Sequence, residues 1–174
     1  LIFLVATFHA SAQQLKGTWM SQMKHDGERI QLTLRYRDNW NSSFGIAVKE
    51  FKGLNTKNIT SGKVDQEFTL EREAGVISFT GTFEDGEGSG HFTFRANEQF
   101  TKDLKSLGFT TPDADEQFSL AIHGVTMNYV KQLKDIGYNR ITMDDLISMS
   151  IHEVTPQYIK GLESLGYSKL PVDD

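Results

Sequence analysis

Two different periods of hydrophobic residues divide this chain. Between residues 17 and 95 apolar and polar residues alternate, as in Ile30-Gln31-Leu32-Thr33-Leu34, and a period of two is typical of strands with one buried face. From Asn97 onward apolar residues recur every three or four positions, which indicates helices. The pattern predicts an α+β protein in which an antiparallel β-meander of about six strands (13–96) precedes a helical region (97–174).

The clearest strand signal is a hairpin around Asp85-Gly86, a dipeptide that favours a two-residue type I′ turn. Folding the chain there places aromatic residues and glycines together on one face. The expected pairs are Phe83–Gly88, Gly81–Gly90, Phe79–Phe92 and Ile77–Phe94. We expect the glycines to leave room for a large side chain or a helix on this apolar face. The segments 39–43 and 53–62 are rich in turn-forming residues and are predicted to be loops.

The helical region repeats its pattern every 29 residues, as Phe100, Tyr129 and Tyr158 show. A fixed period of this length predicts a short stack of helical-hairpin repeats, in which each unit buries its apolar face against the next. Helices are expected to begin after five capping residues, and the three long ones to end in Gly followed by an aromatic residue. The caps are Asn97, Asp113, Thr126, Thr142 and Thr155.

The sequence also predicts what lies at the two ends of the helical region. Only Ala96 separates the last predicted strand from the first helix. The sheet is therefore expected to cap the helical stack by covering its first helix. Residues 170–174 align with residues 141–145, where a short helix is predicted to begin. The residues that recur in each copy are explained by capping and packing. We therefore expect function to lie in positions that vary between copies, such as Gly124 against Glu153.

The first residues resemble the end of a secretory signal peptide. An apolar run over residues 1–8 is followed by small residues that include Ala10 and Ala12, a pattern typical of a cleavage site. Residues 1–12 are therefore predicted to be a signal peptide remnant, and the mature protein to be exported to the periplasm or the extracellular space. A buried N-terminal strand is the alternative interpretation. No apolar run approaches the roughly 18 residues of a membrane-spanning helix, so no membrane span is expected.

Composition narrows the possible functions. The 174 residues have a net charge of −5 and a pI near 5.5, which gives no electrostatic support for nucleic-acid binding. The chain contains no cysteine, which excludes disulfides, thiol catalysis and thiolate metal sites.

Candidate metal and catalytic motifs fail on spacing. His152-Glu153 begins like a zinc-protease signature, but Pro156 stands where the second histidine is required. His123 and His152 recur with the repeat and are interpreted as structural residues at helix ends. The segment 85–90 resembles the start of a calcium loop, but a hairpin turn explains the same residues. The sequence therefore predicts no catalytic, cofactor-binding or metal-binding residue.

The tripeptide Gly17-Thr18-Trp19 resembles the Gly-x-Trp of lipocalins, whose barrels enclose small apolar ligands. The predicted strands fall short of the roughly eight that such a barrel needs, and a core tryptophan explains the same residue. A carrier of a small apolar ligand is therefore the second functional hypothesis.

The segments Ile122–Tyr138 and Ile151–Tyr167 share the pattern Ile-His-x-Val-Thr-x-x-Tyr-(Val/Ile)-Lys-x-Leu-x-x-(Ile/Leu)-Gly-Tyr. This pattern resembles repeats in extracytoplasmic regions of bacterial membrane metallopeptidases related to beta-lactam sensor-transducers, and in small exported bacterial proteins. Residues 68–94 resemble the region that precedes those repeats. The peptidase domain and its zinc motif have no counterpart here, so the resemblance implies an accessory interaction or sensory role without catalytic residues.

Taken together, these features favour a non-enzymatic exported binding module. Its expected partner is a protein of the cell envelope or a second copy of the chain, and a small apolar ligand is the alternative. No cofactor and no nucleic-acid partner are expected.

Overall fold

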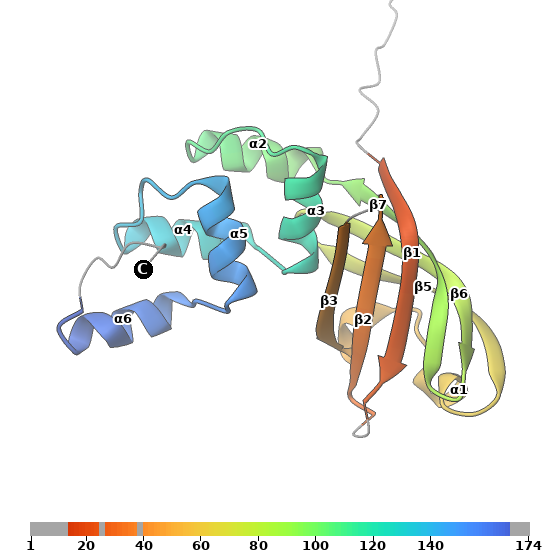
Figure 1. The fold of residues 1–174 in the computed structure, drawn as a ribbon. Helices are drawn as coiled ribbons and strands as arrows, with labels where there is room; N and C mark the ends of the chain where they lie inside the picture. Colours follow the sequence, from red (N-terminus) through yellow and green to blue (C-terminus); the bar gives the residue numbers. More distant parts are fainter. Residues whose placement is uncertain (1–13, 25–26, 38–39, 168–174) are drawn as a thin grey trace, which may run out of the picture.

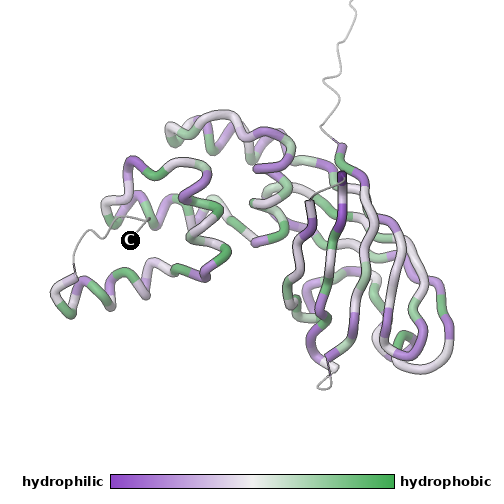
Figure 2. The backbone as a smooth tube through the Cα atoms, in the orientation of Figure 1, coloured by the Kyte–Doolittle hydropathy of each residue, from purple (hydrophilic) through white to green (hydrophobic). Residues whose placement is uncertain are grey.

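The computed structural model describes residues 14–24, 27–37 and 40–167, and it shows an α+β fold in which a curled antiparallel sheet is followed by helices (Figure 1). The predicted signal peptide at residues 1–12 lies outside the described residues, and so does the segment 170–174. Hydrophobic and hydrophilic residues alternate along the strands, as the sequence pattern predicts (Figure 2). The fold class and the order of its two parts are therefore confirmed.

The sheet has seven strands in the order β3-β2-β1-β7-β6-β5-β4. Their bounds are β1 Gln14–Met23, β2 Arg29–Tyr36, β3 Trp40–Ala47, β4 Phe51–Lys52, β5 Lys63–Arg72, β6 Gly75–Glu84 and β7 Glu87–Ala96. The prediction of about six strands missed β4, because two residues are too short to show an alternating pattern. The predicted loop at residues 39–43 is also wrong, since Asn41–Ser43 belong to β3. The side chains of Asn41 and Ser43 lie on its exposed face, where the Ser43 hydroxyl accepts hydrogen bonds from Gln31 and Thr33 at 3.0 Å.

The two edge strands of the sheet are neighbours in the chain. β3 and β4 are joined by the short 3-10 helix Val48–Glu50. Every other pair of consecutive strands is hydrogen-bonded, and β1 also pairs with β7. Because three residues span only about 10 Å, the sheet must curl until its edges approach each other.

The β6–β7 hairpin has the predicted register. Phe79 pairs with Phe92 and Gly81 with Gly90, and Asp85 and Gly86 both have positive φ, as a type I′ turn requires. The glycines make room for Trp19, as expected, because a Cβ atom at Gly81 would lie only 2.7 Å from the Trp19 ring. Trp19 is 1% exposed, and its indole Nε1 donates a hydrogen bond to the Thr80 carbonyl at 3.1 Å. The core interpretation of this tryptophan is confirmed.

The predicted loop at residues 53–62 contains a one-turn helix, α1 Thr56–Ile59, which buries Ile59. Five further helices follow the sheet: α2 Glu98–Ser106, α3 Ala114–Ile122, α4 Met127–Asp135, α5 Met143–Ile151 and α6 Pro156–Ser164. The side chains of all five predicted caps accept backbone hydrogen bonds at the helix starts. The Gly–aromatic ends of α2, α4 and α6 also form as predicted, with bonds such as Tyr138 N–H to the Leu133 carbonyl at 3.0 Å.

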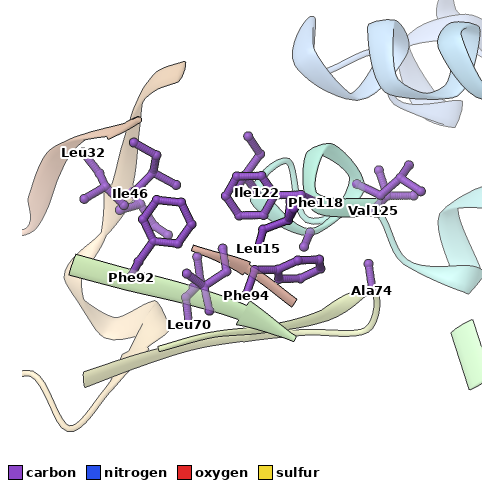
Figure 3. Packing of buried hydrophobic residues seen from close by; sticks show 14 of the residues in the cluster. Leu15, Leu32, Ile46, Leu70, Ala74, Phe92, Phe94, Phe118, Ile122 and Val125 are labelled. Atoms are coloured by element: carbon purple, nitrogen blue, oxygen red, sulfur yellow. The ribbon is translucent and has the colours of Figure 1, made fainter. Parts of the chain in front are cut away.

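The helix that covers the sheet is α3, and the expectation that the sheet caps α2 is wrong. α3 packs against β6 and β7, and five of its nine residues are buried. Its Phe118 ring stacks on Phe92 with ring centroids 5.4 Å apart, and lies 5.1 Å from Phe94 (Figure 3). α2 has a narrow apolar face, whereas α3 has the broad one that burial between two layers requires.

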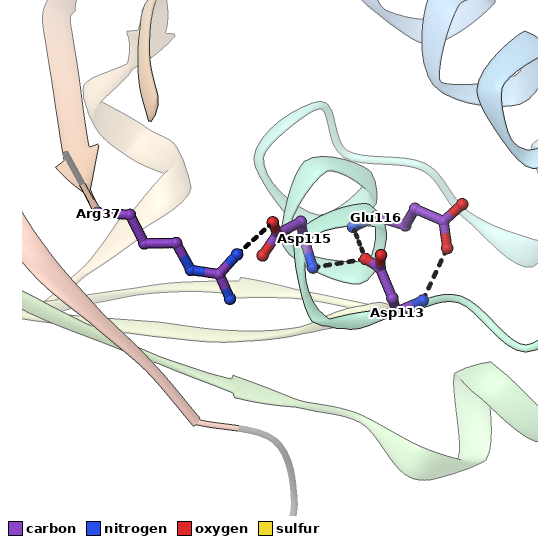
Figure 4. Close-up of polar contacts among 4 residues, drawn as sticks. All are labelled: Arg37, Asp113, Asp115 and Glu116. Atoms are coloured by element: carbon purple, nitrogen blue, oxygen red, sulfur yellow. Dashed lines mark hydrogen bonds and ion pairs between the residues drawn. The ribbon is translucent and has the colours of Figure 1, made fainter. Parts of the chain in front are cut away.

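An ion pair fastens the beginning of α3 to the end of β2. Arg37 Nη1 lies 2.8 Å from Asp115 Oδ2, while Asp113 caps the helix and Glu116 accepts from the Asp113 N–H (Figure 4). Burial, followed by the neighbouring Asp115 carboxylate, raises the pKa of the Tyr36 hydroxyl next to this contact. The buried hydrophobic residues of the sheet and of the helices form one cluster.

None of the helices in the described ranges is long and apolar enough to cross a membrane.

Candidate interaction surface

Large hydrophobic side chains are exposed mainly at the end of α5 and along α6. Of the five such residues in the described part of the chain, only Met20 lies elsewhere. The other four are Ile151, Tyr158, Leu165 and Tyr167, with exposed fractions of 49%, 58%, 74% and 58%. Such side chains are usually scattered singly over a protein surface, so their concentration between the end of α5 and the residues that follow α6 marks a candidate interaction surface.

The positions of Tyr158 and Tyr167 recur 29 and 58 residues earlier in the sequence, and the aromatic side chains there are less exposed. Phe100 in α2 is 2% exposed, Tyr129 in α4 is half-buried, and Tyr158 in α6 is 58% exposed. Exposure rises in the same order from Phe109 through Tyr138 to Tyr167. All six side chains are aromatic. Their exposure therefore differs because different parts of the protein pack over them.

Tyr129 shows how the position is covered. Its hydroxyl donates a hydrogen bond to the Val154 carbonyl at 2.7 Å, at the junction between α5 and α6. Burial at this contact raises the pKa of Tyr129 to about 12. The junction between α5 and α6 therefore covers α4 at this position. Tyr158 has no counterpart of this contact among the described residues.

One face of α6 and of its C-terminal cap carries two exposed large side chains, Tyr158 and Leu165, with the exposed Gly161 and the half-buried Leu162 between them. Tyr158, Gly161, Leu162 and Leu165 are spaced i, i+3, i+4 and i+7, which places them on one helical face. Ile159 lies on a different face, is 5% exposed and belongs to the hydrophobic core. α6 thus presents one apolar face to the protein and a second one to its surroundings. We call the four residues the α6 stripe.

A groove of about 780 Å³ forms a second candidate site. It lies between β3, the end of β5 and the C-terminal ends of α3 and α5, where the two parts of the fold meet. The residues that line it include Phe44, Arg72, Glu73, His123, Ser150 and Glu153.

The charged groups of the groove are largely bonded to the protein itself. Arg72 Nη2 lies 2.6 Å from Glu50 Oε2, and the Glu73 carboxylate accepts a hydrogen bond from the Met127 N–H at 2.7 Å. Arg29 Nη2 donates to the Gly45 carbonyl on the free edge of β3 at 2.8 Å. These contacts join β2 to β3, β5 to the 3-10 helix Val48–Glu50, and the turn after β5 to α4.

His123 and His152 both occupy the C-terminal caps of their helices, α3 and α5, as the sequence predicts. They differ in surroundings, because His123 lies in the groove near the Phe44 ring whereas His152 is exposed. Burial lowers the pKa of His123. Asp85 stands in the hairpin turn, where its carboxylate accepts from the Gly62 N–H at 2.9 Å. No group of three or more potential metal ligands occurs in the described ranges.

The groove gives a pH-dependent prediction. Because the pKa of His123 is lowered, the unfolded chain binds a proton first as the pH falls below about 6.5. The free energy of unfolding should therefore decrease with acidification from that pH until folded His123 is also protonated. The free energy of unfolding, measured with urea between pH 7 and pH 5, should depend less on pH in His123→Asn than in the wild type. The exposed His91→Asn serves as the control, and an equal change in both variants would contradict the prediction.

Aromatic side chains occupy the concave face of the sheet. Trp19 lies with ring centroids 5.3 Å from Phe83 and 6.1 Å from Phe79, and Phe68 stacks on Phe79 at 4.7 Å. These rings pack against one another on the face where a lipocalin-like carrier would hold its ligand.

Sequence reasoning did not identify the α6 stripe. The sequence pattern marks Tyr158 as a recurring structural residue and assigns no role to Gly161. A signal was present, since Gly161 replaces Asp103 and Gln132 at the equivalent positions of α2 and α4. It is one of the positions that vary between the copies.

Comparison of the chain with models of protein families, with curated proteins and with solved structures gave no match.

Proposed function

We propose that this protein is a non-enzymatic exported interaction module of the cell envelope. In this proposal α2–α6 form a stack of helical repeats with a 29-residue unit, and the stack binds a protein through the α6 stripe. The observation that carries the proposal is the exposure of Tyr158 and Leu165 at positions whose counterparts are buried or half-buried in the preceding copies. An apolar face of this kind gains free energy when a partner removes it from water.

Two sequence features support the envelope location. The pattern at residues 1–12 is typical of an export signal. The repeated Ile-His-x-Val-Thr pattern resembles the extracytoplasmic repeats of membrane metallopeptidases related to beta-lactam sensor-transducers. The proposed role is therefore accessory to an envelope sensor or peptidase system.

The two alternative functions have less structural support. An enzyme would present polar groups to a substrate, whereas Glu50, Arg72 and Glu73 of the groove bond to other groups of the chain. A ligand carrier would keep space on the concave face, where Trp19 and Phe79 are in contact with other rings. Native mass spectrometry of the purified chain tests the carrier hypothesis, which a co-purified apolar molecule would support.

The proposed function is tested by quantitative binding with matched variants. Wild-type protein and the double variant Tyr158→Ser/Leu165→Ser are immobilised and exposed to envelope extract, and self-association is measured in parallel. We expect at least one of the two kinds of binding to fall about tenfold in the double variant, because its apolar contact area is lost.

The control for this experiment is Thr80→Ala/His91→Ala, which changes two exposed residues on the convex face of the sheet. Circular dichroism checks that both variants fold. Equal binding by wild type, double variant and control in both assays would contradict the proposed function.

A further inference from the structure

The free edge of β3 is the least protected edge of the sheet (Figure 1). β3 extends over eight residues, Trp40–Ala47, and contains neither a charged residue nor a proline. Proteins usually shield an edge strand with such residues or keep it very short, because its unpaired backbone groups attract other chains. The opposite edge strand, β4, has only two residues, and β5 beside it carries charges at Lys63, Asp65 and Glu67.

The hydrogen-bonding pattern shows which backbone groups of β3 face away from the sheet. The Val48 N–H donates to the Glu28 carbonyl at 2.8 Å, and bonded pairs recur at every second residue of an antiparallel ladder. The even-numbered residues of β3 therefore bond to β2. The backbone N–H and C=O groups of Asn41, Ser43 and Gly45 face the free edge, and all three residues are exposed.

Two side chains bond to one end of this edge in the way that a neighbouring strand would. Arg29 Nη2 donates to the Gly45 carbonyl at 2.8 Å, and Glu50 Oε1 accepts from the Ala47 N–H at 3.2 Å. The outward backbone groups from Asn41 to the Gly45 N–H have no hydrogen-bonding partner in the part of the chain that the structure describes. This stretch is therefore open to pairing with a further strand.

The groove of about 780 Å³ lies beside this edge. β3 contributes residues 43–46 to its lining, and the end of β5 and the C-terminal ends of α3 and α5 form the other walls. Its volume is in the range of ligand-binding clefts. Phe44, Ile122 and Ile151 supply apolar side chains, and Ile151 is 49% exposed. An extended chain paired with β3 therefore has an apolar wall on one side for alternate side chains.

The groove is also acidic, since four glutamates and two arginines line it. Two of the glutamates belong to ion pairs, which leaves Glu73 and Glu153 without a cationic partner among the described residues. α3 and α5 both end at the groove, where the carbonyl end of a helix carries partial negative charge. These charges favour a lysine or arginine side chain in a ligand.

We infer that the free edge of β3 binds an extended segment of another protein, which pairs with β3 as an eighth strand of the sheet. The segment carries apolar residues at alternate positions and a lysine or arginine that lies near Glu153. Main-chain hydrogen bonds to β3 supply affinity, and the groove selects the side chains. The site is separate from the α6 stripe, so the inference goes beyond the proposed function.

A peptide selection tests this inference without a known partner. The probe is a phage-displayed library of random peptides of about ten residues, which covers the length of an ordinary strand. The library is selected against the full chain. We expect the enriched peptides to alternate apolar with other residues and to contain lysine or arginine. A selection that enriches no peptide, or that enriches acidic ones, would overturn the inference.

Ser43→Pro tests the strand pairing. Proline removes the outward N–H at the centre of the edge and none of the bonds to β2. We expect the enriched peptides to bind this variant at least about tenfold more weakly than Ser43→Ala. Ser43→Ala is the matched control, because it loses the same hydroxyl and keeps the N–H. Circular dichroism checks that both variants fold, and equal affinities would overturn the inference.

Glu153→Gly tests the charge with a variant that keeps the fold. Gly124 stands at the equivalent position after α3, and both residues have positive φ, so glycine is suited to this backbone. The enriched peptides should bind about twofold to fivefold more weakly at low salt, and high salt should remove the difference. The control is Glu87→Gln, which neutralises an exposed carboxylate on β7. Equal affinities for the two variants would overturn the assignment of a basic ligand.

Amide hydrogen exchange measured by NMR distinguishes strand pairing from other contacts in the groove. The Ser43 and Gly45 N–H groups should exchange at least about tenfold more slowly when an enriched peptide is bound. The Phe44 N–H faces β2 and should be protected with and without the peptide. Unchanged exchange at Ser43 and Gly45 would overturn the inference.

Failure of this inference is distinguishable from failure of the proposed function. The variant Tyr158→Ser/Leu165→Ser should bind the enriched peptides like the wild type, since neither residue is among those that line the groove. Loss of peptide binding in that variant would place the peptide on the α6 stripe and overturn the inference. A wild-type dimer that Ser43→Pro abolishes would assign the edge to a second copy of the chain and would also overturn it.

Discussion

Replacing Phe118 by alanine should lower the free energy of unfolding by about 3–5 kcal/mol, the range for a large aromatic side chain removed from a packed core. Phe118 is fully buried, and its ring contacts Phe92 and Phe94 of β7. It also lies 5.4 Å, between ring centroids, from both Tyr36 and Trp40 at the ends of β2 and β3. One ring thus joins three strands to α3, and few surrounding groups can move into the space that it leaves.

Urea unfolding followed by circular dichroism and by tryptophan fluorescence measures this loss. The two signals report mainly on the helices and on the sheet, since Trp19 and Trp40 both belong to strands. Leu165→Ala is the control. Its side chain is 74% exposed, so we expect a change within about 0.5 kcal/mol. A loss below about 1 kcal/mol for Phe118→Ala would show that the sheet and α3 do not depend on this contact.

The features that sequence reasoning predicted correctly are set by neighbouring residues. The turn at Asp85-Gly86 determines the register of β6 and β7, because a two-residue loop leaves one pairing. The start of α5 depends on Thr142 and Asp145, which bond reciprocally to each other's N–H groups. In each case a short stretch of sequence contains both partners of the interaction.

The features that it missed depend on distant partners. β4 exists because Phe51 finds Leu70 on β5, and two residues carry no periodic signal of their own. Asn41–Ser43 read as a loop, yet they form a strand because β2 offers them hydrogen-bonding partners. The docking of α3 in place of α2 follows from ring contacts that Phe118 makes with residues 24 and more positions away in the chain. Tertiary packing decides such features, and propensity alone does not.

The exposure of the α6 stripe also depends on distant partners, so local sequence does not predict it. Tyr129 and Tyr158 are the same residue in the same local pattern, so a local argument treats them alike. One donates a hydrogen bond to the Val154 carbonyl, and the other is 58% exposed. The difference arises from the element that follows each helix in space. Gly161, which lies within the α6 stripe, is one of the positions that vary between the copies.

Substitution of Gly81 by alanine should destabilise the protein by about 3 kcal/mol, because a single methyl group has no space in this part of the sheet. A Cβ atom at Gly81 would collide with the Ser89 carbonyl oxygen and lie 2.7 Å from the Trp19 ring. The carbonyl belongs to the backbone of the neighbouring strand, and Trp19 is held by its hydrogen bond to Thr80. Neither group can move without disturbing the β6–β7 pairing.

A second glycine separates this steric effect from backbone strain. Gly62 has φ of +69°, and a Cβ atom there would meet nothing within 4 Å. Gly62→Ala should therefore cost only the roughly 1–2 kcal/mol of a left-handed conformation. Thermal and urea unfolding of both variants measure the comparison, and tryptophan fluorescence should change only in Gly81→Ala, because only that substitution displaces Trp19. Equal losses with unchanged fluorescence would mean that the ring does not depend on the absence of a side chain at Gly81.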